Sequence, residues 1–450
     1  MTTGLPAIFA HGIVGRADLP IPAELFGAAA AAVLAISFAA LAAGWTRPRL
    51  EAVRERRLFP LPLAVDVVGG TVGVLAFALV VYAGLAGSNV VQDNLAPTAI
   101  YVAFWIGVPV TSLVLGDVFR VLSPWRALGR PAGWLVKRFG GEDLAEPIPY
   151  PERLGRWPAV AGLVAFAFVE LCWSRGDDPQ TLAICALVYF AVQVVGQGLF
   201  GVETWTRNGD AFGVYFSLFA GLSPFTRRDG SLWVRPPLAG AVHIARPAGT
   251  VALLSVAIGS TVFDGAKEGG LFGSVLPHLQ DFFVSLGASK GTALQWAFVL
   301  GLVAAIALVR ALYALGVGGM PKRMADPAAA FVHSLIPIAA AYVIAHYFSL
   351  LAYNGQMLLP LLSDPLGDGH DYLGAAQRGI DYNVVSATAI WYVQVGALVT
   401  GHVAALVLAH DRALALYGSA REATRSQVVM LIVMIAFTSL GLWLLSVANQ

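Results

Sequence analysis

Histidine and carboxylate side chains recur at two places in the chain where they could bind a metal ion. The first set consists of His11 near the N-terminus, His346 in a long apolar segment, and His370 and Asp371 in a polar, glycine-rich stretch. Imidazole and carboxylate ligands suit zinc, copper, iron or manganese, and such a divalent ion activates water at neutral pH. This outer set predicts a hydrolytic metal site; the alternative is that these are ordinary polar residues of solvated loops.

The second set consists of His333, His402, His410 and Asp411. His333 lies in the same apolar segment as His346, and the other three lie in or just after the next apolar segment. Eight residues separate His402 from His410, which turns their side chains about 80° apart on one helix. These two histidines alone therefore cannot chelate one ion. We expect His333, at the start of the preceding segment, to meet His410 and Asp411 at the inner surface. A haem shared by His346 and His402 is disfavoured, because neighbouring segments run antiparallel and His346 lies nearer the outer side. Other pairings, such as one with His243, remain open.

Other ionisable residues also lie within or beside apolar segments. An ionisable group inside a membrane is unfavourable, so each one is a hypothesis of function. For Glu170 and Glu203, close to segment ends, the alternative is that they reach water. Arg310 is about two turns from its segment's inner end and could extend its guanidinium to the surface.

These side chains must be positioned by long apolar helices. The chain of 450 residues is 58% hydrophobic and 12% charged, whereas a soluble domain is about 25% charged. A helix needs roughly 20 apolar residues to cross the hydrocarbon core. We predict one all-α membrane domain, a bundle of about ten transmembrane helices. Their approximate bounds are 22–45, 61–86, 96–119, 157–173, 180–204, 247–264, 290–317, 328–352, 383–409 and 426–447.

The distribution of basic residues predicts the orientation of this bundle. With both termini outside, 22 of the 28 Lys and Arg residues fall in inner loops and five in outer loops, with Arg310 inside a segment. Such asymmetry is typical of cytoplasmic loops. Arginine outnumbers lysine by 24 to 4, which suggests a bacterium of high GC content and hence its inner membrane. The expected surroundings are lipid, together with a membrane partner subunit or a homo-oligomer. A net charge of +1 gives no reason to expect nucleic acid.

One apolar stretch, 211–224, is too short to cross the membrane. If it crossed the membrane, all later loops would lie on the opposite side, which conflicts with the charge asymmetry. We therefore predict a re-entrant or interfacial helix, with an amphipathic surface helix as the alternative. A weak internal repeat accompanies it: GDVF at 116–119 and GDAF at 209–212 are each followed by Ser-Pro. Repeats of this kind occur in transporters, although chance also explains so short a match.

Four stretches resemble a family of bacterial membrane proteins, common in actinobacteria, known as fenitrothion hydrolases. They are HGIVGRADLPIP (11–22), GDVFRVLSPWRALGR (116–130), AHYFSLLAYNGQ (345–356) and GHVAALVLAHDRALALYG (401–418). The resemblance runs nearly the whole length. It implies hydrolysis of an organophosphate triester with an aryl leaving group, but it assigns no chemical role to individual residues.

Three functions therefore compete. The first is a membrane-embedded, metal-assisted hydrolase, as the resemblance implies. The second is a secondary transporter or permease, indicated by the helix count, the short segment at 211–224 and the buried polar residues. The third is a metal- or haem-binding membrane subunit of a larger assembly, indicated by the eight histidines.

Overall fold

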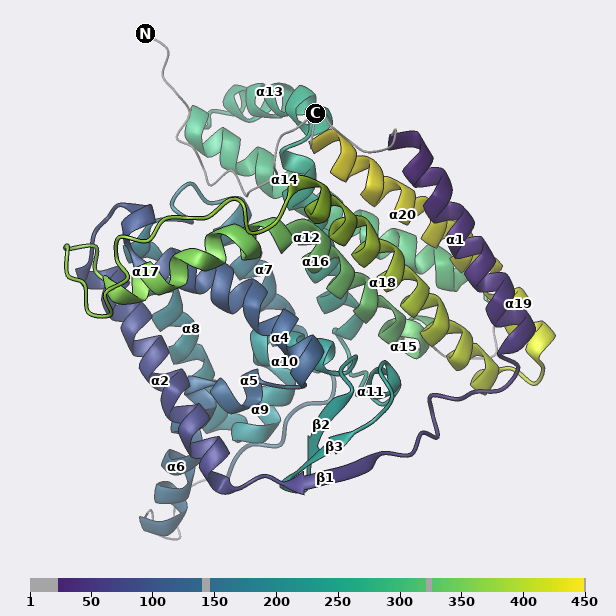
Figure 1. The fold of residues 1–450 in the computed structure, drawn as a ribbon, viewed down its shortest axis with the longest axis horizontal. Helices are drawn as coiled ribbons and strands as arrows, with labels where there is room; N and C mark the ends of the chain where they lie inside the picture. Colours follow the sequence, from purple (N-terminus) through teal and green to yellow (C-terminus); the bar gives the residue numbers. More distant parts are fainter. Residues whose placement is uncertain (1–22, 140–145, 321–325, 449–450) are drawn as a thin grey trace.

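The computed structural model describes residues 23–139, 146–320 and 326–448. Within these ranges almost all regular structure is helical, and long helices pack side by side (Figure 1). The prediction of an all-α helical bundle is confirmed. His11 lies outside the described residues.

Apart from its first helix, the first half of the chain builds one side of the bundle (Figure 1). Its helices are α1 (Ala23–Gly44), α2 (Leu63–Ala86), α3 (Leu95–Thr98), the π-helix η2 (Ala99–Gly107), α4 (Val108–Leu115), α5 (Phe119–Leu122), α6 (Pro124–Phe139), α7 (Trp157–Leu171), α8 (Pro179–Phe200), α9 (Val202–Asn208) and α10 (Ala211–Ala220), with the 3₁₀ turn η1 (Val91–Asp93). Within this half α2 packs on α8 and α6, and α10 packs on α4 and α7.

The second half supplies the other side. Its helices are α11 (Ala239–Val242), α12 (Thr250–Lys267), α13 (Gly270–Ser285), α14 (Lys290–Gly318), α15 (Pro327–Phe331), α16 (Leu335–Tyr353), α17 (Leu358–Ser363), α18 (Ala387–Leu416), α19 (Ala420–Ser426) and α20 (Val428–Ala448), with the 3₁₀ turns η3 (Val332–Ser334) and η4 (Asn354–Met357). Helix α16 packs on α18 and α12, while α1 returns to pack on α20 (Figure 1).

Local sequence signals explain where several helices begin. Asp178 accepts a hydrogen bond from the Thr181 amide at the start of α8, where Pro179 occupies the first helical position. Ser289 and Ser386 cap α14 and α18 in the same way. A capping oxygen satisfies an amide that the first turn leaves unpaired, and proline suits that turn because it has no amide to lose.

Small residues let the central helices approach closely. A Cβ on Gly401 of α18 would lie 2.3 Å from the Ala341 Cβ of α16, and one on Gly259 of α12 would lie 2.6 Å from the Ile306 Cα of α14. Helices in lipid associate through such close packing of backbones. The same contacts bring α12, α14, α16 and α18 into one block.

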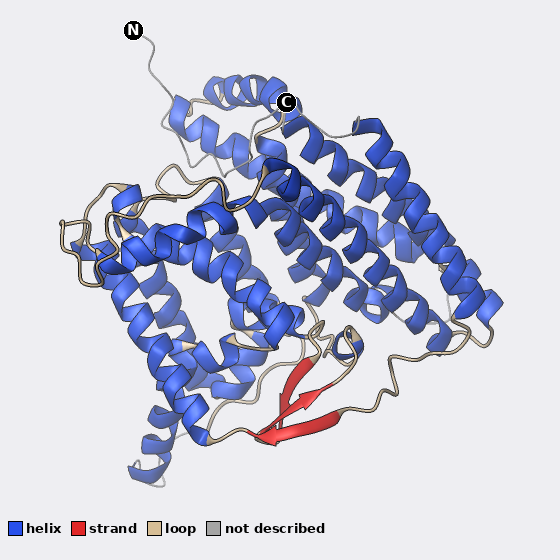
Figure 2. Ribbon diagram, viewed as in Figure 1, coloured by secondary structure: helices blue, strands red, loops and turns tan. Residues whose placement is uncertain are grey.

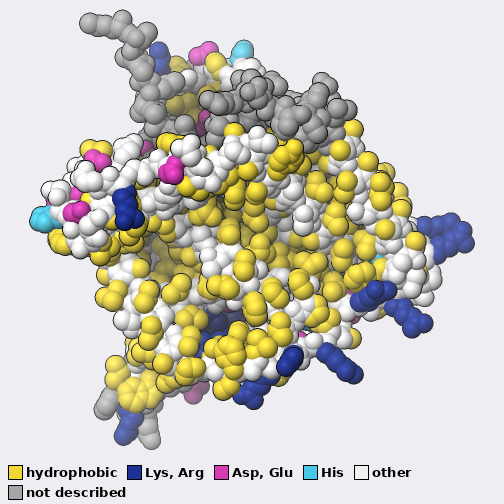
Figure 3. Space-filling model, viewed as in Figure 1, with side chains coloured by type: hydrophobic (Ala, Val, Ile, Leu, Met, Phe, Trp, Pro, Cys, Tyr) yellow, Lys and Arg dark blue, Asp and Glu magenta, His cyan; other side chains and the backbone are white. Residues whose placement is uncertain are grey.

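Eight helices among the described residues are long and apolar enough to cross a membrane, and the pair α19–α20 adds a ninth that is bent by 42°. Helix α7 is apolar but has only 15 residues. The predicted number of about ten is therefore approximate. Apolar side chains cover the middle of the face in Figure 3, and most of its Lys and Arg residues lie along the edge that carries the β-strands, α6 and α19. The chain is thus a multi-pass membrane protein.

A small antiparallel sheet, which the sequence analysis did not predict, lies at one end of the bundle (Figure 2). Strands β1 (Arg56–Pro60), β2 (Phe225–Arg228) and β3 (Ser231–Val234) are ordered β1-β3-β2. Asp229 and Gly230 form the β2–β3 turn with φ of 50° and 66°, as two-residue hairpins favour. Arg227 binds the Asp66 carboxylate through both Nη atoms, at 2.6 and 2.7 Å, and so attaches the sheet to α2.

The short apolar stretch at 211–224 forms α10, which lies in the interior. Eight of its ten residues are buried, and it packs on α4, α5, α7, α9 and α16. Asp210 caps it by accepting hydrogen bonds from the Gly213 amide, the Trp125 indole and the Tyr189 hydroxyl. A helix of this length that ends inside the bundle needs protein around it, because lipid cannot satisfy its terminal backbone groups.

Candidate functional site: a buried polar centre between α12 and α16

The most unusual group of side chains surrounds Asp264, in the last turn of α12. Its carboxylate Oδ2 lies 2.9 Å from His346 Nε2 and accepts a hydrogen bond of 2.8 Å from the Tyr347 hydroxyl. Its Oδ1 lies 2.8 Å from Lys267 Nζ. We call these four residues the Asp264 centre. The i, i+3 spacing places Lys267 beside Asp264 on α12, and consecutive residues of α16 supply the other two.

The Asp264 centre is almost entirely removed from solvent. The exposed fraction is 1% for the Asp264 side chain and 8% for each of Lys267 and His346. Isolated charges at such depth are highly unfavourable, but a carboxylate and an ammonium in contact compensate each other. With its proton on Nε2, neutral His346 donates to Asp264, and its Nδ1 makes no hydrogen bond to the described part of the chain. The centre therefore holds a compensated ion pair and one imidazole nitrogen that is not hydrogen-bonded to a described residue.

Two buried polar groups beside the Asp264 centre have no hydrogen-bond partner among the residues that the structure describes. They are Trp105 Nε1 and the Tyr215 hydroxyl, on side chains that are 3% and 1% exposed. Their rings stack with centroids 5.4 Å apart. Trp105 lies next to the Tyr347 hydroxyl without a hydrogen bond of normal geometry. Buried polar atoms are rarely left unpaired, so these donors are a natural place for water or a polar ligand.

The elements that carry these two donors are irregular. Trp105 belongs to the π-helix η2, in the middle of the span Leu95–Leu115, and Tyr215 belongs to the short α10. Pro109 has no amide to donate to the Trp105 carbonyl four residues earlier, which disfavours a regular α-helix here. π-Helical turns occur frequently at functional sites. Glu170 of α7 adds a further acid, within electrostatic range of Asp264 and Lys267.

The structure separates the predicted outer metal set. His346 pairs with Asp264, whereas His370 and Asp371 lie in the exposed stretch after α17. His370 Nδ1 is 2.6 Å from Asp368 Oδ1, and this carboxylate raises the pKa of His370 above its ordinary value. Asp371 accepts hydrogen bonds from Ser363 Oγ and from backbone amides, which lower its pKa.

In the predicted inner set, His410 and Asp411 join α18 to the loop after α1. The Asp411 carboxylate accepts hydrogen bonds from the Trp45 indole (2.9 Å) and from the backbone amides of Arg49 (2.6 Å) and Leu50 (3.2 and 3.3 Å). The Asp411 side chain is fully buried, and every donor that it meets here is neutral.

His410 Nε2 lies 3.0 Å from the Trp45 carbonyl oxygen, and its Nδ1 lies 3.1 Å from Gln427 Nε2. A neutral imidazole with its proton on Nε2 satisfies both contacts, since the Gln427 amide then donates to Nδ1. Both ring nitrogens are thereby engaged. We call His410, Asp411 and Gln427 the α18 anchor.

The two other inner histidines stand apart from the α18 anchor. His402 Nδ1 donates a hydrogen bond of 2.7 Å to the Leu398 carbonyl, while its Nε2 has no partner. The His402 ring contacts those of Tyr342 and Phe437. His333 is fully buried, with neither ring nitrogen hydrogen-bonded. No three His, Cys, Asp or Glu side chains within 23–139, 146–320 and 326–448 are grouped to hold a metal ion.

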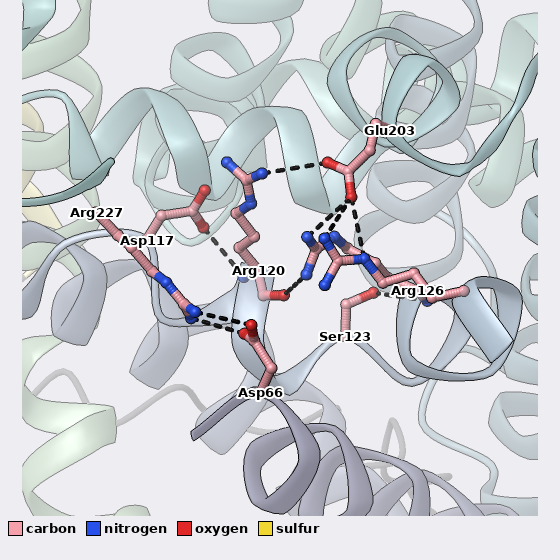
Figure 4. A network of polar contacts seen from close by, with 8 residues as sticks. Asp66, Asp117, Arg120, Ser123, Arg126, Glu203 and Arg227 are labelled. Atoms are coloured by element: carbon pink, nitrogen blue, oxygen red, sulfur yellow. Dashed lines mark hydrogen bonds and ion pairs between the residues drawn. The ribbon is translucent and has the colours of Figure 1, made fainter. Parts of the chain in front are cut away.

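A second ionic network joins α5, α6 and α9 (Figure 4). Glu203 contacts the guanidinium groups of Arg120 at 3.2 Å, Arg126 at 2.9 Å and Arg130 at 3.0 Å. The Glu203 side chain is 39% exposed, so water screens these pairs. This network therefore ties short helices together at a wet surface, unlike the Asp264 centre.

No protein-family model matches the chain, and neither a curated protein nor a solved structure matches it significantly. The geometry must therefore carry the functional argument. The sequence pointed to His346 but missed Asp264, Lys267 and Tyr347. The predicted segment 247–264 ended at Asp264, whereas α12 continues to Lys267. The signal available was the D-x-x-K spacing at the end of that segment.

Proposed function

We propose that this protein is a proton-coupled secondary transporter of the bacterial inner membrane, with both termini outside. The observation that carries the proposal is the Asp264 centre, a compensated group of ionisable side chains between two candidate membrane spans. The basic edge in Figure 3 supports the orientation, because basic residues favour the cytoplasmic side. Alkaline phosphatase fused after Ala448 is expected to be active in the periplasm; an inactive fusion contradicts the orientation.

Buried ionisable residues in membrane spans mark ion pathways and proton relays. A purely structural role is served more simply by apolar packing, since replacing a buried ion pair with hydrophobic residues is often neutral or stabilising. Asp264, Lys267 and His346 are supplied by two helices that pack directly on each other. A relative movement of α12 and α16 would separate the acid from the histidine and thereby change the proton affinity of both.

The helices around the Asp264 centre also have the irregularities found in transporters. Solute and ion sites there are formed by discontinuous helices near the middle of the membrane. Here the π-helix η2 and the short α10 carry the unpaired donors of Trp105 and Tyr215. We infer that a polar solute accepts hydrogen bonds from these two groups while the Asp264 centre binds the coupling proton.

A proton taken up at His346 Nδ1 makes an imidazolium, so that Asp264 then faces two cations, His346 and Lys267. The imidazolium attracts Asp264 of α12 more strongly than the neutral ring does, and this change couples protonation of His346 on α16 to the packing of the two helices. The solute is unidentified, so the proton itself is the first probe. Proteoliposomes on a solid-supported membrane are expected to give a transient current when the external pH is lowered.

Replacing Asp264 with Asn should reduce that transient current at least tenfold, because the amide cannot stabilise the imidazolium. Asp281→Asn is the matched control, since Asp281 is exposed on α13 and lies outside the centre. A wild-type protein without any pH-dependent current, or an Asp264→Asn variant with full current, contradicts the proposal.

A hydrolase, as the resemblance implies, is a second proposal, and one observation favours it. The hydrogen bond between Asp264 and His346 is the arrangement that orients an imidazole as a general base. The described residues do not group three ligands for a metal ion, so this proposal rests on His346 as the base. Membranes containing the protein are tested for release of the phenol from fenitrothion. Activity that His346→Ala abolishes and His278→Ala on α13 preserves supports the hydrolase.

The third function, a metal- or haem-binding subunit, predicts bound metal without turnover by the chain alone. His402 is the buried histidine with one unpaired ring nitrogen, but no second ligand accompanies it in the described part of the chain. Elemental analysis of the detergent-purified protein for iron, copper, zinc and manganese tests this function directly. Stoichiometric metal supports it, and a metal-free, folded protein removes it.

A further inference from the structure

Arg156 is a buried guanidinium that has no acidic partner among the described residues. It immediately precedes α7, and its exposed fraction is 6%. Within the described ranges its side chain makes one hydrogen bond, from Nη1 to Thr250 Oγ1 at 3.3 Å. Its Nε is buried and unpaired. Thr250 Oγ1 itself donates to the Pro247 carbonyl, so this contact is to a neutral hydroxyl and leaves the positive charge uncompensated.

The contrast with Arg126 shows how unusual this is. Arg126 is also buried, but its Nη2 contacts the Glu203 carboxylate at 2.9 Å. At Arg156 no acid opposes the effect of burial, which lowers the pKa of the guanidinium to about 10. The group still carries its proton at neutral pH. An uncompensated buried charge is strongly unfavourable, so an anion from outside the chain would gain this energy on binding.

Two helix N-termini lie at the same place. Arg156 precedes α7, and Thr250 is the first residue of α12; neither helix has a side-chain cap. The Arg156 amide donates to the Ala248 carbonyl at 2.7 Å, and Gly249, with φ of 86°, allows the two backbones to approach. Helix N-termini carry partial positive charge that favours phosphate groups. The Trp157 and Thr250 amides donate to the carbonyls three residues earlier, so later amides of the first turns face the site. Three positive features thus converge here, and no carboxylate of the described part of the chain accompanies them.

We propose that Arg156, Thr250 and the first turns of α7 and α12 form a binding site for a phosphate group. Two sources share this chemistry, the headgroup of an anionic phospholipid and free phosphate. The neighbouring Trp157 is 50% exposed at the start of an apolar helix, where aromatic side chains meet lipid headgroups. A guanidinium presents its donors in a planar fork that matches phosphate oxygens.

The lipid source is tested by native mass spectrometry of the full-length protein in detergent containing phosphatidylglycerol or phosphatidylcholine. The wild type should retain phosphatidylglycerol selectively, and Arg156→Gln should lower retention at least tenfold. Arg153→Gln is the matched control, because it removes the same charge from an exposed residue in the same loop. The free-phosphate source is tested by thermal unfolding in sodium phosphate against sodium chloride at equal ionic strength.

Selective retention of phosphatidylglycerol assigns the lipid headgroup, and a phosphate-dependent rise of the unfolding midpoint without lipid retention assigns free phosphate. If Arg156→Gln does not fold, Arg156→Lys keeps the charge, loses the fork and should bind about tenfold more weakly. A wild type that retains no anionic lipid and ignores phosphate overturns the proposal. Equal binding by wild type and Arg156→Gln or Arg156→Lys overturns it as well.

Discussion

The Asp264 centre and the α18 anchor use the same residue types for different purposes. Each has a buried aspartate and a buried histidine on packed helices. In the α18 anchor, Asp411 and His410 meet backbone groups, an indole and an amide, none of which titrates. At the Asp264 centre, every partner of Asp264 described above is itself ionisable: His346, Lys267 and the Tyr347 phenol. The nature of the partners, rather than burial, distinguishes a structural contact from a functional site.

The largest expected effect concerns the α18 anchor. Replacing Asp411 with Ala leaves the Trp45 indole and two backbone amides unpaired, and should destabilise the protein by about 3–5 kcal/mol, since hydrogen bonds to charged groups are worth about 1.5–3 kcal/mol each and do not add fully. Asp411→Asn retains one acceptor and should lose less. Chemical unfolding in detergent measures both, with Asp281→Ala as control. Wild-type stability of Asp411→Ala would remove the structural assignment.

At the Asp264 centre, unlike at the α18 anchor, a second substitution should restore the stability that the first one removes. Asp264→Leu alone leaves Lys267 buried and unpaired, a loss of about 3 kcal/mol. Adding Lys267→Met removes the stranded charge and should restore the stability to within about 1 kcal/mol of wild type, while the pH-driven current stays absent. Chemical unfolding in detergent measures the stability of the single and double variants, and the solid-supported-membrane assay measures their pH-driven current. If the double variant remains as unstable as the single one, Asp264 has a structural role like that of Asp411.

A matched pair of histidine substitutions sharpens the comparison. In His410→Gln one of the two contacts made by the ring is lost, which should destabilise the protein by about 1 kcal/mol. His346→Gln retains a donor for Asp264 and should change stability less, but it removes the group that takes up a proton and therefore the current. Current without destabilisation in His346→Gln would contradict the proton-binding role of His346.

Much of the fold follows from composition and spacing. The apolar segments and the basic residues between them predicted a membrane bundle, because lipid leaves helices few alternatives. The sheet was missed, although Asp229-Gly230 between two short alternating runs is a hairpin signal; the basic residues around it were counted only as loop charge. The GDVF and GDAF stretches proved alike in one respect: Asp117 and Asp210 each accept from the amide three residues later.

The site was predicted less well, because partners come from distant segments. His346 was identified, yet Asp264, 82 residues away, became its partner, and no local pattern specifies that contact. His402, the deepest histidine in the sequence, is packed against aromatic rings instead of other ligands. His410 and Asp411 were predicted as metal ligands. In the structure both form hydrogen bonds with Trp45, which lies 365 and 366 positions earlier in the chain.

The exposed pair of His370 and Asp368 gives the smallest expected effect and completes the comparison. Asp368 raises the pKa of His370, and His370 in turn lowers the pKa of Asp368. Stability from a raised histidine pKa is present below the unfolded value of about 6.5 and is lost as the pH rises through the folded value. Asp368→Asn should therefore lower the unfolding midpoint slightly at pH 5.5 and not at pH 8.5. Because water surrounds both groups, the difference should be far smaller than at Asp411. A pH-independent difference would show that the Asp368 side chain acts through its backbone hydrogen bond to the His370 amide instead of through charge.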